Sequence, residues 1–294
     1  MKKLLSGFLG ISMAVFLKMQ LTEHFEFPTM ASRRHSRRSL STASTIATKW
    51  QPKSHAISCP NKAATLNRTI FKSQGKEDFE LFKWFGKLCN GTYMEMGALD
   101  GVTFSNTHAF HYGLDWKGLL LEASPKNYER LVQNRPNELA LVHAGVCAEA
   151  SDLHWIEGKW DATSGFLEFA TDAHKQNFFT GGRLEQAQIV RCQPLRDTIK
   201  EQLGENVYFD FYSLDIEGAE FAALESLDFD KVSFGMILVE ADGQNPVKDM
   251  AVKTLLESKG YRYMPTTQEH TRFGSLWFMN KDWHNIYKDL IYAS

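Results

Sequence analysis

Apolar segments that end on acidic residues constrain the fold of this chain most strongly. Segments 117–122, 208–215 and 234–240 each end on an Asp or Glu, and segment 92–97 ends in a turn that contains glycine. Their length and apolar content predict buried strands. Helical patterns lie between or beside them, at residues 77–88, 106–112, 126–134, 198–203, 219–226 and 250–259. This alternation predicts a mostly parallel sheet with right-handed crossovers and helices on both faces.

Shorter strand patterns complete the expected fold. Residues 139–144 predict a third parallel strand, and residues 261–265 and 275–279 predict an antiparallel pair at the C-terminal end. Between these regions, short strand patterns indicate a hairpin inserted after the third strand, at residues 152–156, 165–169 and 186–191.

Charge divides the chain into two parts. The 294 residues carry a formal charge of −2, and the composition is ordinary for a globular protein, which excludes disorder throughout, collagen and coiled coil. Up to Lys76 the chain holds 13 Lys and Arg but only two acids, whereas the rest holds 20 basic and 33 acidic residues. We therefore expect a basic segment ahead of an acidic domain at residues 77–294.

The basic part itself has two regions. Residues 1–21 contain Lys2, Lys3 and an apolar run from Leu4 to Leu17, which is short for a spanning helix. We interpret it as a signal anchor, with a cleaved signal peptide or an organelle transit peptide as alternatives. Residues 22–76 are rich in Ser, Thr and Arg and predict a flexible stem. An endoplasmic reticulum or Golgi lumenal domain on a single membrane span follows from the first interpretation.

Other features depend on that compartment. The sequons at Asn67 and Asn90 matter only in a secretory lumen. The cysteines, Cys59, Cys89, Cys147 and Cys192, are compatible with disulfides there, and Cys59 with Cys89 would tie the stem to the domain; four reduced thiols are the simpler interpretation. Their spacing suggests no zinc site, so no metal is expected. Clustered Arg attracts phosphate, yet a linker accounts for the stem, and no nucleic-acid partner is expected.

The chemistry should lie at the carboxyl ends of the strands, where parallel sheets bind ligands. Gly97 and Gly101 allow a tight turn after the first strand, and Glu95 and Asp100 place carboxylates beside it. These acids would repel a pyrophosphate and favour a cationic ligand such as S-adenosylmethionine. They also disfavour a nicotinamide-dependent oxidoreductase, since the turn lacks the Gly-x-Gly-x-x-Gly pattern.

Two further strand ends carry candidate residues. Glu122 ends the second strand about 20 residues on, at the place of an acid that binds ribose hydroxyls, and Ser124 begins the next helix. Asp215 and Glu217 end another apolar strand, where loss of solvent would shift their pKa values towards those of a general base. Glu220 is interpreted as a first-turn helix acid, and Glu240 as a substrate contact.

Three motifs in order resemble those of FkbM-type methyltransferases. They are Tyr93-Met94-Glu95-Met96-Gly97-Ala98-Leu99-Asp100-Gly101, Trp116-Lys117-Gly118-Leu119-Leu120-Leu121-Glu122-Ala123-Ser124-Pro125 and Asp210-Phe211-Tyr212-Ser213-Leu214-Asp215-Ile216-Glu217-Gly218-Ala219-Glu220. The chain departs from the family at Leu99, where Asn is frequent, and at Ala123, where Pro is usual.

The resemblance implies a class I Rossmann-like methyltransferase fold, with a seven-stranded sheet and an antiparallel C-terminal strand. It implies S-adenosylmethionine as donor and a hydroxyl of a sugar or other small metabolite as acceptor. By motif, Glu95, Gly97 and Asp100 should lie near the methionine end of the donor. Glu122 should lie at the ribose and Asp215 near the methyl group.

Within that expectation Asp215 is the first candidate for the general base, with Glu217, Asp242 and His108 as rivals. A sugar pocket could use Trp155, Trp160 or Trp277, and residues 158–183 and 244–249 are expected to shape it. The alternative is a catalytically silent, membrane-tethered module with the same fold, because fold does not fix function.

Overall fold

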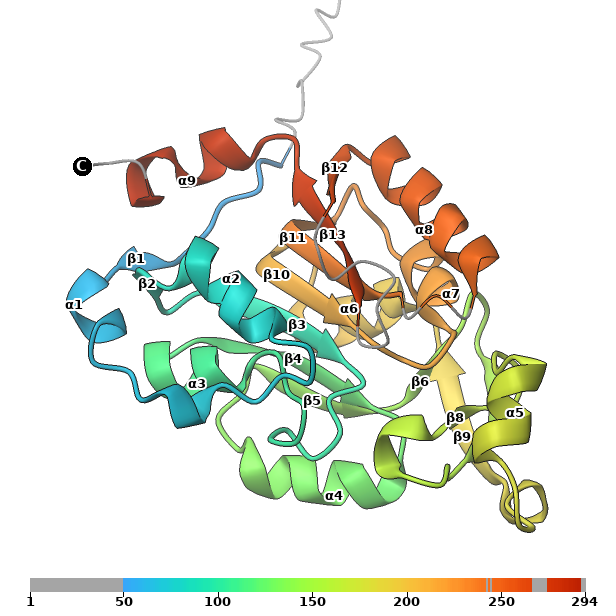
Figure 1. The fold of residues 1–294 in the computed structure, drawn as a ribbon. Coiled ribbons are helices and arrows are strands. Elements are labelled where there is room, and N and C mark those ends of the chain that lie inside the picture. The colour runs from blue at the N-terminus through green and yellow to red at the C-terminus, as the bar shows by residue number, and fades with distance from the viewer. Residues whose placement is uncertain (1–49, 242, 244, 266–273, 292–294) are drawn as a thin grey trace, which may run out of the picture. The chain divides into compact units, whose positions relative to one another are not determined.

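The computed structural model describes residues 50–241, 243, 245–265 and 274–291. A seven-stranded sheet forms its centre, in the order β12-β13-β11-β10-β3-β4-β5 (Figure 1). The strands are β3 (Thr92–Met96), β4 (Lys117–Glu122), β5 (Ala140–His143), β10 (Val207–Leu214), β11 (Val232–Glu240), β12 (Tyr261–Met264) and β13 (Ser275–Asn280). β13 pairs antiparallel with both of its neighbours, β11 and β12, and the other strand pairs of this sheet are parallel. The predicted mostly parallel seven-stranded sheet with an antiparallel C-terminal strand is confirmed.

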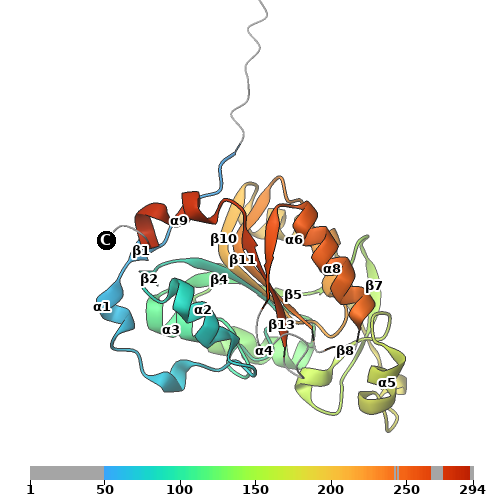
Figure 2. The same cartoon turned by 45° about the horizontal axis from the view of Figure 1, so that its top comes forward.

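Helices cover both faces of this sheet (Figures 1 and 2). They are α2 (Glu77–Phe85), α3 (His108–Leu114), α4 (Pro125–Asn134), α6 (Leu195–Leu203), α7 (Glu220–Glu225), α8 (Pro246–Ser258) and α9 (Trp283–Ile291). Strand side chains alternate between the two faces: Leu119 and Leu121 join one core cluster with residues of α6, α7 and α8, and Leu120 joins another with residues of α2, α3 and α9. Burial on both faces explains why the strand sequences are almost continuously apolar.

A small second sheet follows β5, as the inserted hairpin pattern predicts. Its strands run in the order β6-β9-β7-β8, namely β6 (Gly145–Val146), β9 (Gln188–Gln193), β7 (Ser151–Ile156) and β8 (Gly165–Phe166). Helix α5 (Asp172–Phe178) follows β8. A disulfide between Cys147 and Cys192 links the chain next to β6 with β9. This insertion stands at the end of the main sheet where the parallel strands finish (Figure 1).

Residues 50–76 differ from the expected flexible stem. They include β1 (Ile57–Ser58), which pairs with β2 (Leu88–Cys89), and the short helix α1 (Pro60–Ala63). The Cys59–Cys89 disulfide adds a covalent link, so reduced thiols, the simpler sequence interpretation, do not describe this structure. Apolar residues such as Trp50 and Leu66 pack on the core beneath α2 and α3, which the average composition of the segment concealed.

The signal anchor at residues 1–21 and the first part of the stem lie outside the described residues. Among the residues that the structure does describe, no helix combines the length and the hydropathy needed to cross a membrane.

Candidate functional site

A cavity of about 780 Å³ opens at the carboxyl ends of the parallel strands. Its walls come from the turns after β3, β4, β10 and β11 and from the inserted sheet. This volume is within the range of about 300–1,000 Å³ that is usual for small-molecule and cofactor sites. Six of the predicted site residues line it: Glu95, Gly97, Asp100, Glu122, Asp215 and Glu217.

Gly101 and Ser124 lie behind the cavity wall and support it. Gly101 has a φ of +76°, and a Cβ there would collide with Arg135 and Leu131. Its carbonyl oxygen accepts a hydrogen bond from Arg135 Nη1 at 2.9 Å. Ser124 caps α4, since its hydroxyl accepts from Asn127 N at 3.3 Å. Both residues therefore shape the cofactor turns without facing the cavity.

The carboxylate of Glu95 is saturated by donors of its own chain. It accepts from Thr107 Oγ1 at 2.6 Å, from Asn106 N at 2.7 Å and from Ser105 Oγ at 3.0 Å. Burial raises the pKa of Glu95, opposed by the charge of Arg135 and by these hydrogen bonds. Glu95 thus holds the loop 105–107 in place and contributes shape to the cavity.

Arg135 is the buried counter-charge of this region, and no sequence signal singled it out. Its guanidinium donates to Tyr93 Oη at 2.7 Å, to Thr107 Oγ1 at 3.0 Å and to Glu138 Oε1 at 2.8 Å. An arginine just after a helix usually lies at the surface, where its positive charge interacts favourably with the C-terminal end of the helix. Here the side chain is fully buried and connects α4 to the turn after β3.

The turn after β3 presses closely against the end of β10. Gly97 has a φ of +76°, and a Cβ would collide with the carbonyl of Asp215. Asp100 accepts from Thr103 N at 2.6 Å and from Val102 N at 2.9 Å. Burial acts to raise the pKa of Asp100, but these hydrogen bonds outweigh it and lower the pKa. Asp100 therefore stays ionised and closes the turn.

Leu99 occupies a strained position in the same turn. Its φ of +48° is in the left-handed region, which Asn tolerates better than Leu. This backbone conformation gives a physical reason for the Asn that is frequent at this place in the family. Leu99 N donates to Glu122 Oε2 at 2.8 Å, so the strained turn also fixes the next acid.

Glu122 ends β4 at the middle of the cavity. Its second oxygen accepts from Ser124 N at 2.8 Å. Burial, with a smaller contribution from the nearby Glu157, raises the pKa of Glu122 to about 8, although the backbone hydrogen bonds oppose this. The predicted position at the end of the second strand is found in the structure, and ribose binding by this carboxylate stays a prediction.

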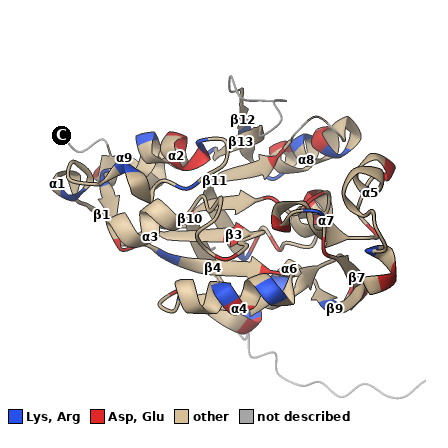
Figure 3. Ribbon diagram, turned by 60° about the horizontal axis from the view of Figure 1, so that its bottom comes forward, with Lys and Arg blue, Asp and Glu red and all other residues tan. Residues whose placement is uncertain are grey.

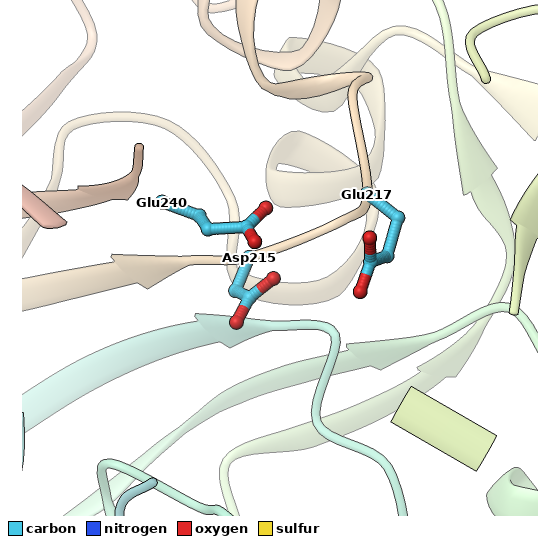
Figure 4. Close-up of side chains that lie close together, drawn as sticks. All are labelled: Asp215, Glu217 and Glu240. Carbon is cyan, nitrogen blue, oxygen red and sulfur yellow. The ribbon is translucent and has the colours of Figure 1, made fainter. Parts of the chain in front are cut away.

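Asp215, Glu217 and Glu240 form an open cluster of acids at the ends of β10 and β11. One carboxylate oxygen from each lies within 4.8 Å of the others. Figure 4 shows the Asp215 and Glu240 carboxyl groups side by side, with Glu217 facing them from the following turn. All three line the cavity. We name them the acid triad; the expectation of no metal stays a prediction.

Asp215 and Glu240 of the acid triad titrate as interacting groups. Burial, followed by the negative charge of Glu220, raises the pKa of Asp215 to about 7. Burial and the charge of Asp215 raise the pKa of Glu240 well above its ordinary value. The Asp215 side chain is exposed and lines the cavity, whose walls restrict solvation of its carboxylate. At neutral pH the pair is therefore expected to hold about one proton between its two carboxyl groups.

The structure separates the rival base candidates. His108 is outside the cavity wall: its Nδ1 lies 2.8 Å from Ile70 O, and its ring packs on Tyr112. This contact gives His108 a structural role, and its role as a base stays a prediction that its position does not favour. Asp242 lies outside the described residues.

The three tryptophans expected at a sugar pocket differ in whether they line the cavity. Trp155 and Trp160 line the cavity, whereas Trp277 is part of the core under the sheet. Trp155 packs edge-on against Phe166, and Trp160 is 55% exposed at the rim. The expected acceptor region 158–183 contributes wall residues, but among the described residues of 244–249 none lines this cavity.

Ion pairs hold the inserted sheet against α4. Asp161 Oδ1 lies 2.9 Å from Lys126 Nζ, and Asp161 Oδ2 lies 3.3 Å from Arg130 Nη1. Figure 3 shows basic residues along α4. The insertion lies beside Glu122 in the cavity wall, and these exposed ion pairs are one of its contacts with α4.

Two polar atoms in the wall test whether a donor such as S-adenosylmethionine fits. Asn127 Nδ2 and Asn106 Oδ1 are buried and have no hydrogen-bond partner in the described part of the chain. Both residues line the cavity, one near Glu122 and one near Ser213. Buried polar groups are normally paired. A ligand with polar groups along its length, bound between apolar and acidic walls, matches this wall.

A family model identifies the class of protein. The model of the "Methyltransferase FkbM domain" family matches residues 95–263, more than half of the chain. A comparison with curated proteins finds no match.

Three solved structures illustrate the similarity of fold. The Methylobacillus flagellatus methyltransferase FkbM shares 12% identity at a TM-score of 0.39, covering 65% of this chain and 43% of that one. The Geobacter metallireducens precorrin-6y C5,15-methyltransferase shares 12% identity at a TM-score of 0.38, and the match covers 76% of this chain and 95% of that one. The Aeropyrum pernix fibrillarin, solved with natively bound S-adenosyl-L-methionine, shares 11% identity at a TM-score of 0.35. This match covers 65% of this chain and 67% of that one.

At such low TM-scores the assignment rests on the family model and on the strand order described above. The present chain spans less than half the length of the Methylobacillus protein. The match of the family model includes the turn after β3, Glu122 and the acid triad. This chain belongs to the FkbM family of S-adenosylmethionine-dependent methyltransferases.

Proposed function

We propose that this protein O-methylates a hydroxyl group of a sugar or other small metabolite. The observation that carries the proposal is the acid triad, which opens into the cavity beside the Gly97 turn. S-adenosylmethionine, when bound, supplies a methyl group on a positively charged sulfur. An ionised carboxylate next to the acceptor hydroxyl is the group that such a transfer requires from the protein.

The cavity wall offers a distinct place for each part of the donor. The turn after β3 would lie at the methionine end, since the lack of a Cβ on Gly97 lets this turn pack against the Asp215 carbonyl at the cavity. Glu122 would accept hydrogen bonds from the ribose hydroxyls. The rings of Trp155 and Phe166, on the inserted sheet, provide an apolar surface for the adenine. Positioning of donor and acceptor would supply most of the rate enhancement.

Asp215 is proposed as the general base. Its pKa of about 7 suits proton removal near neutral pH. Glu240 lies beside it and can share the proton, and Glu217 faces both from the turn. In this proposal an oxygen of Asp215 would take the hydroxyl proton as the acceptor oxygen bonds to the methyl carbon, while the carbon–sulfur bond of the donor breaks and a neutral thioether leaves.

The acceptor would be a neutral hydroxyl compound. Trp160 at the rim and Phe178 behind it, with ring centroids 6.1 Å apart, offer an aromatic surface for the face of a sugar ring. The acid triad would accept hydrogen bonds from hydroxyls and would repel phosphate or carboxylate groups.

We further propose a lumenal location in the secretory pathway with an N-terminal membrane anchor. Two disulfides, Cys59–Cys89 and Cys147–Cys192, support an oxidising compartment. The sequon residues Asn67 and Asn90 are both exposed, so glycans could be attached. A mobility shift of the expressed chain on N-glycosidase treatment, lost in the Asn67→Gln/Asn90→Gln double variant, would support this; unglycosylated protein from secretory cells would contradict it.

The activity test uses the full chain, methyl-labelled S-adenosylmethionine and neutral glycans or a total metabolite extract. We expect label in a product that resists mild alkali, because a methyl ether survives conditions that hydrolyse a methyl ester. Label released by alkali would contradict transfer to a hydroxyl. Absence of donor binding to the folded chain in calorimetry would favour the catalytically silent module instead.

A further inference from the structure

Two buried residues of opposite charge lie directly behind the acid triad. Glu220 begins α7 and is fully buried, and Lys248 lies in the first turn of α8 with a side chain that is only 8% exposed. The Lys248 Nζ and Glu220 Oε2 atoms are 2.8 Å apart. The sequence interpretation of Glu220 as an ordinary first-turn helix acid misses this partner, which is 28 positions further along the chain.

Each member of the pair holds the backbone of one acid-bearing strand end. Glu220 Oε1 accepts from Ile216 N at 3.1 Å and from Gly218 N at 3.0 Å, which fixes the turn of Asp215 and Glu217. Lys248 Nζ donates to the carbonyl oxygen of Glu240 at 3.2 Å, which fixes the end of β11. One ion pair thus ties together the two strand ends that carry the acid triad.

The pair also sets the charge around the triad. Lys248 faces Glu220 and Asp249, and it lies near enough to Asp215 and Glu240 to lower the pKa of each against the effect of burial. Glu220 acts in the opposite direction on both pKa values.

Other titratable groups face the triad from neighbouring elements. Glu77 of α2 raises the pKa of Asp215, and Glu217 raises that of Glu240. His174 Nδ1 of α5 lies 3.5 Å from Glu217 Oε2. Because Lys248 and Glu220 act on the triad with opposite signs, their substitutions make opposite predictions.

We propose that Lys248 and Glu220 are positioning residues, which hold the Asp215 and Glu240 carboxyl groups at their spacing and keep Asp215 available as a base. This inference rests on the proposed function of Asp215. Stability alone is a poor explanation of the pair, since replacing a buried ion pair by apolar residues is often neutral or stabilising.

The test measures the Asp215 titration directly, by carbon-detected NMR of the carboxyl groups in the full chain, with Asp215→Asn to assign the signal. We expect Lys248→Met to raise the Asp215 pKa by about one unit and Glu220→Gln to lower it by a similar amount, since each removes one nearby charge. Lys248→Arg keeps the charge and should restore most of the original value. Lys200→Met, which removes an exposed ion-paired lysine of α6, is the control and should change nothing.

The same variants are then assayed for transfer. We expect the acid limb of the pH profile of kcat to move to higher pH for Lys248→Met and to lower pH for Glu220→Gln. The donor affinity should change by less than about threefold, because neither residue lines the cavity. If Lys248→Met does not fold, Glu220→Gln alone still tests the expected direction of the change in the Asp215 pKa. Equal titration of Asp215 in wild type and folded variants would overturn the inference. A wild-type chain without transfer activity would instead contradict the proposed function. The NMR titration would then still show whether Lys248 and Glu220 act on the Asp215 carboxyl group.

Discussion

The acids at the two halves of the cavity differ in what their oxygens contact. At the β3 and β4 ends, Glu95, Asp100 and Glu122 accept hydrogen bonds from neighbouring backbone or hydroxyl groups. At the β10 and β11 ends, the triad residues Asp215 and Glu240 face one another and the cavity. Acids at strand ends therefore act as parts of the scaffold where donors saturate them, as at Glu95, whereas among the described residues no backbone or hydroxyl donor is seen at Asp215 or Glu240, whose carboxyl groups face the cavity.

The largest expected effect is on transfer, in Asp215→Asn. Loss of a general base lowers the rate by roughly 100- to 10,000-fold. We expect kcat to fall by this amount while the donor still binds, as measured by labelled transfer and calorimetry. The same substitution at Asp152, an exposed residue of β7 paired with Arg191, is the control and should leave both quantities unchanged. Full turnover by Asp215→Asn would assign the base elsewhere.

Glu95→Gln should instead reduce stability. The NH2 group of the amide would face Asn106 N or the hydroxyls that now donate to Glu95, so two donors would meet. A buried polar group left without a partner costs about 1–3 kcal/mol. We expect the free energy of unfolding to fall by that amount in denaturant titrations. Asp215→Asn should leave it unchanged or raise it, because repulsion within the triad is relieved. An equal loss of stability in both variants would remove the distinction between scaffold and open acids.

Glu122 adds a pH dependence at the β4 end of the cavity. Its folded-state pKa of about 8 lies above the ordinary 4.5, so the folded state holds the proton more tightly than the unfolded state. This contribution to stability is complete below pH 4.5 and is lost as the pH rises through about 8. We expect the Tm of the donor-free protein to fall over this window, and to fall less in Glu122→Gln. A parallel decline in both proteins would show that the carboxyl group titrates normally.

The smallest expected effect concerns the exposed ion pairs of the insertion. Asp161→Asn removes the contacts with Lys126 and Arg130, and exposed pairs contribute about 0–1 kcal/mol. We expect a small decrease in Tm at low salt that disappears at high salt. A loss as large as that of Glu95→Gln would mean that the insertion depends on this contact for its placement.

The strands and the turn glycines were predictable because local patterns encode them. The apolar runs that became β4, β10 and β11 end on the residues predicted, within about two positions. Gly97, Glu122 and Asp215 could be placed at the site because carboxyl ends of parallel strands meet at one edge.

The supporting residues could not be predicted because their partners are distant in sequence. Arg135 donates to residues 101 and 107 of the turn after β3, and Lys248 pairs with Glu220 and donates to the end of β11. No periodicity or spacing links a charged helix residue to a turn made by another segment. The folding of residues 50–76 onto the domain was missed for the same reason, since β1 needs β2 as its partner.

The Cys59–Cys89 disulfide has a consequence for release of the domain from whatever precedes it. The segment between the two cysteines contains exposed residues such as Asn61, Thr65 and Arg68, where a protease could act. A single cut there leaves both fragments covalently joined, so cleavage alone would not shed the domain. Shedding would require a cut ahead of Cys59, or a cut between the two cysteines together with reduction of the disulfide. β1 and α9 lie together at the end of the sheet away from α5 (Figures 1 and 2), so either event would leave the cavity at the opposite end untouched.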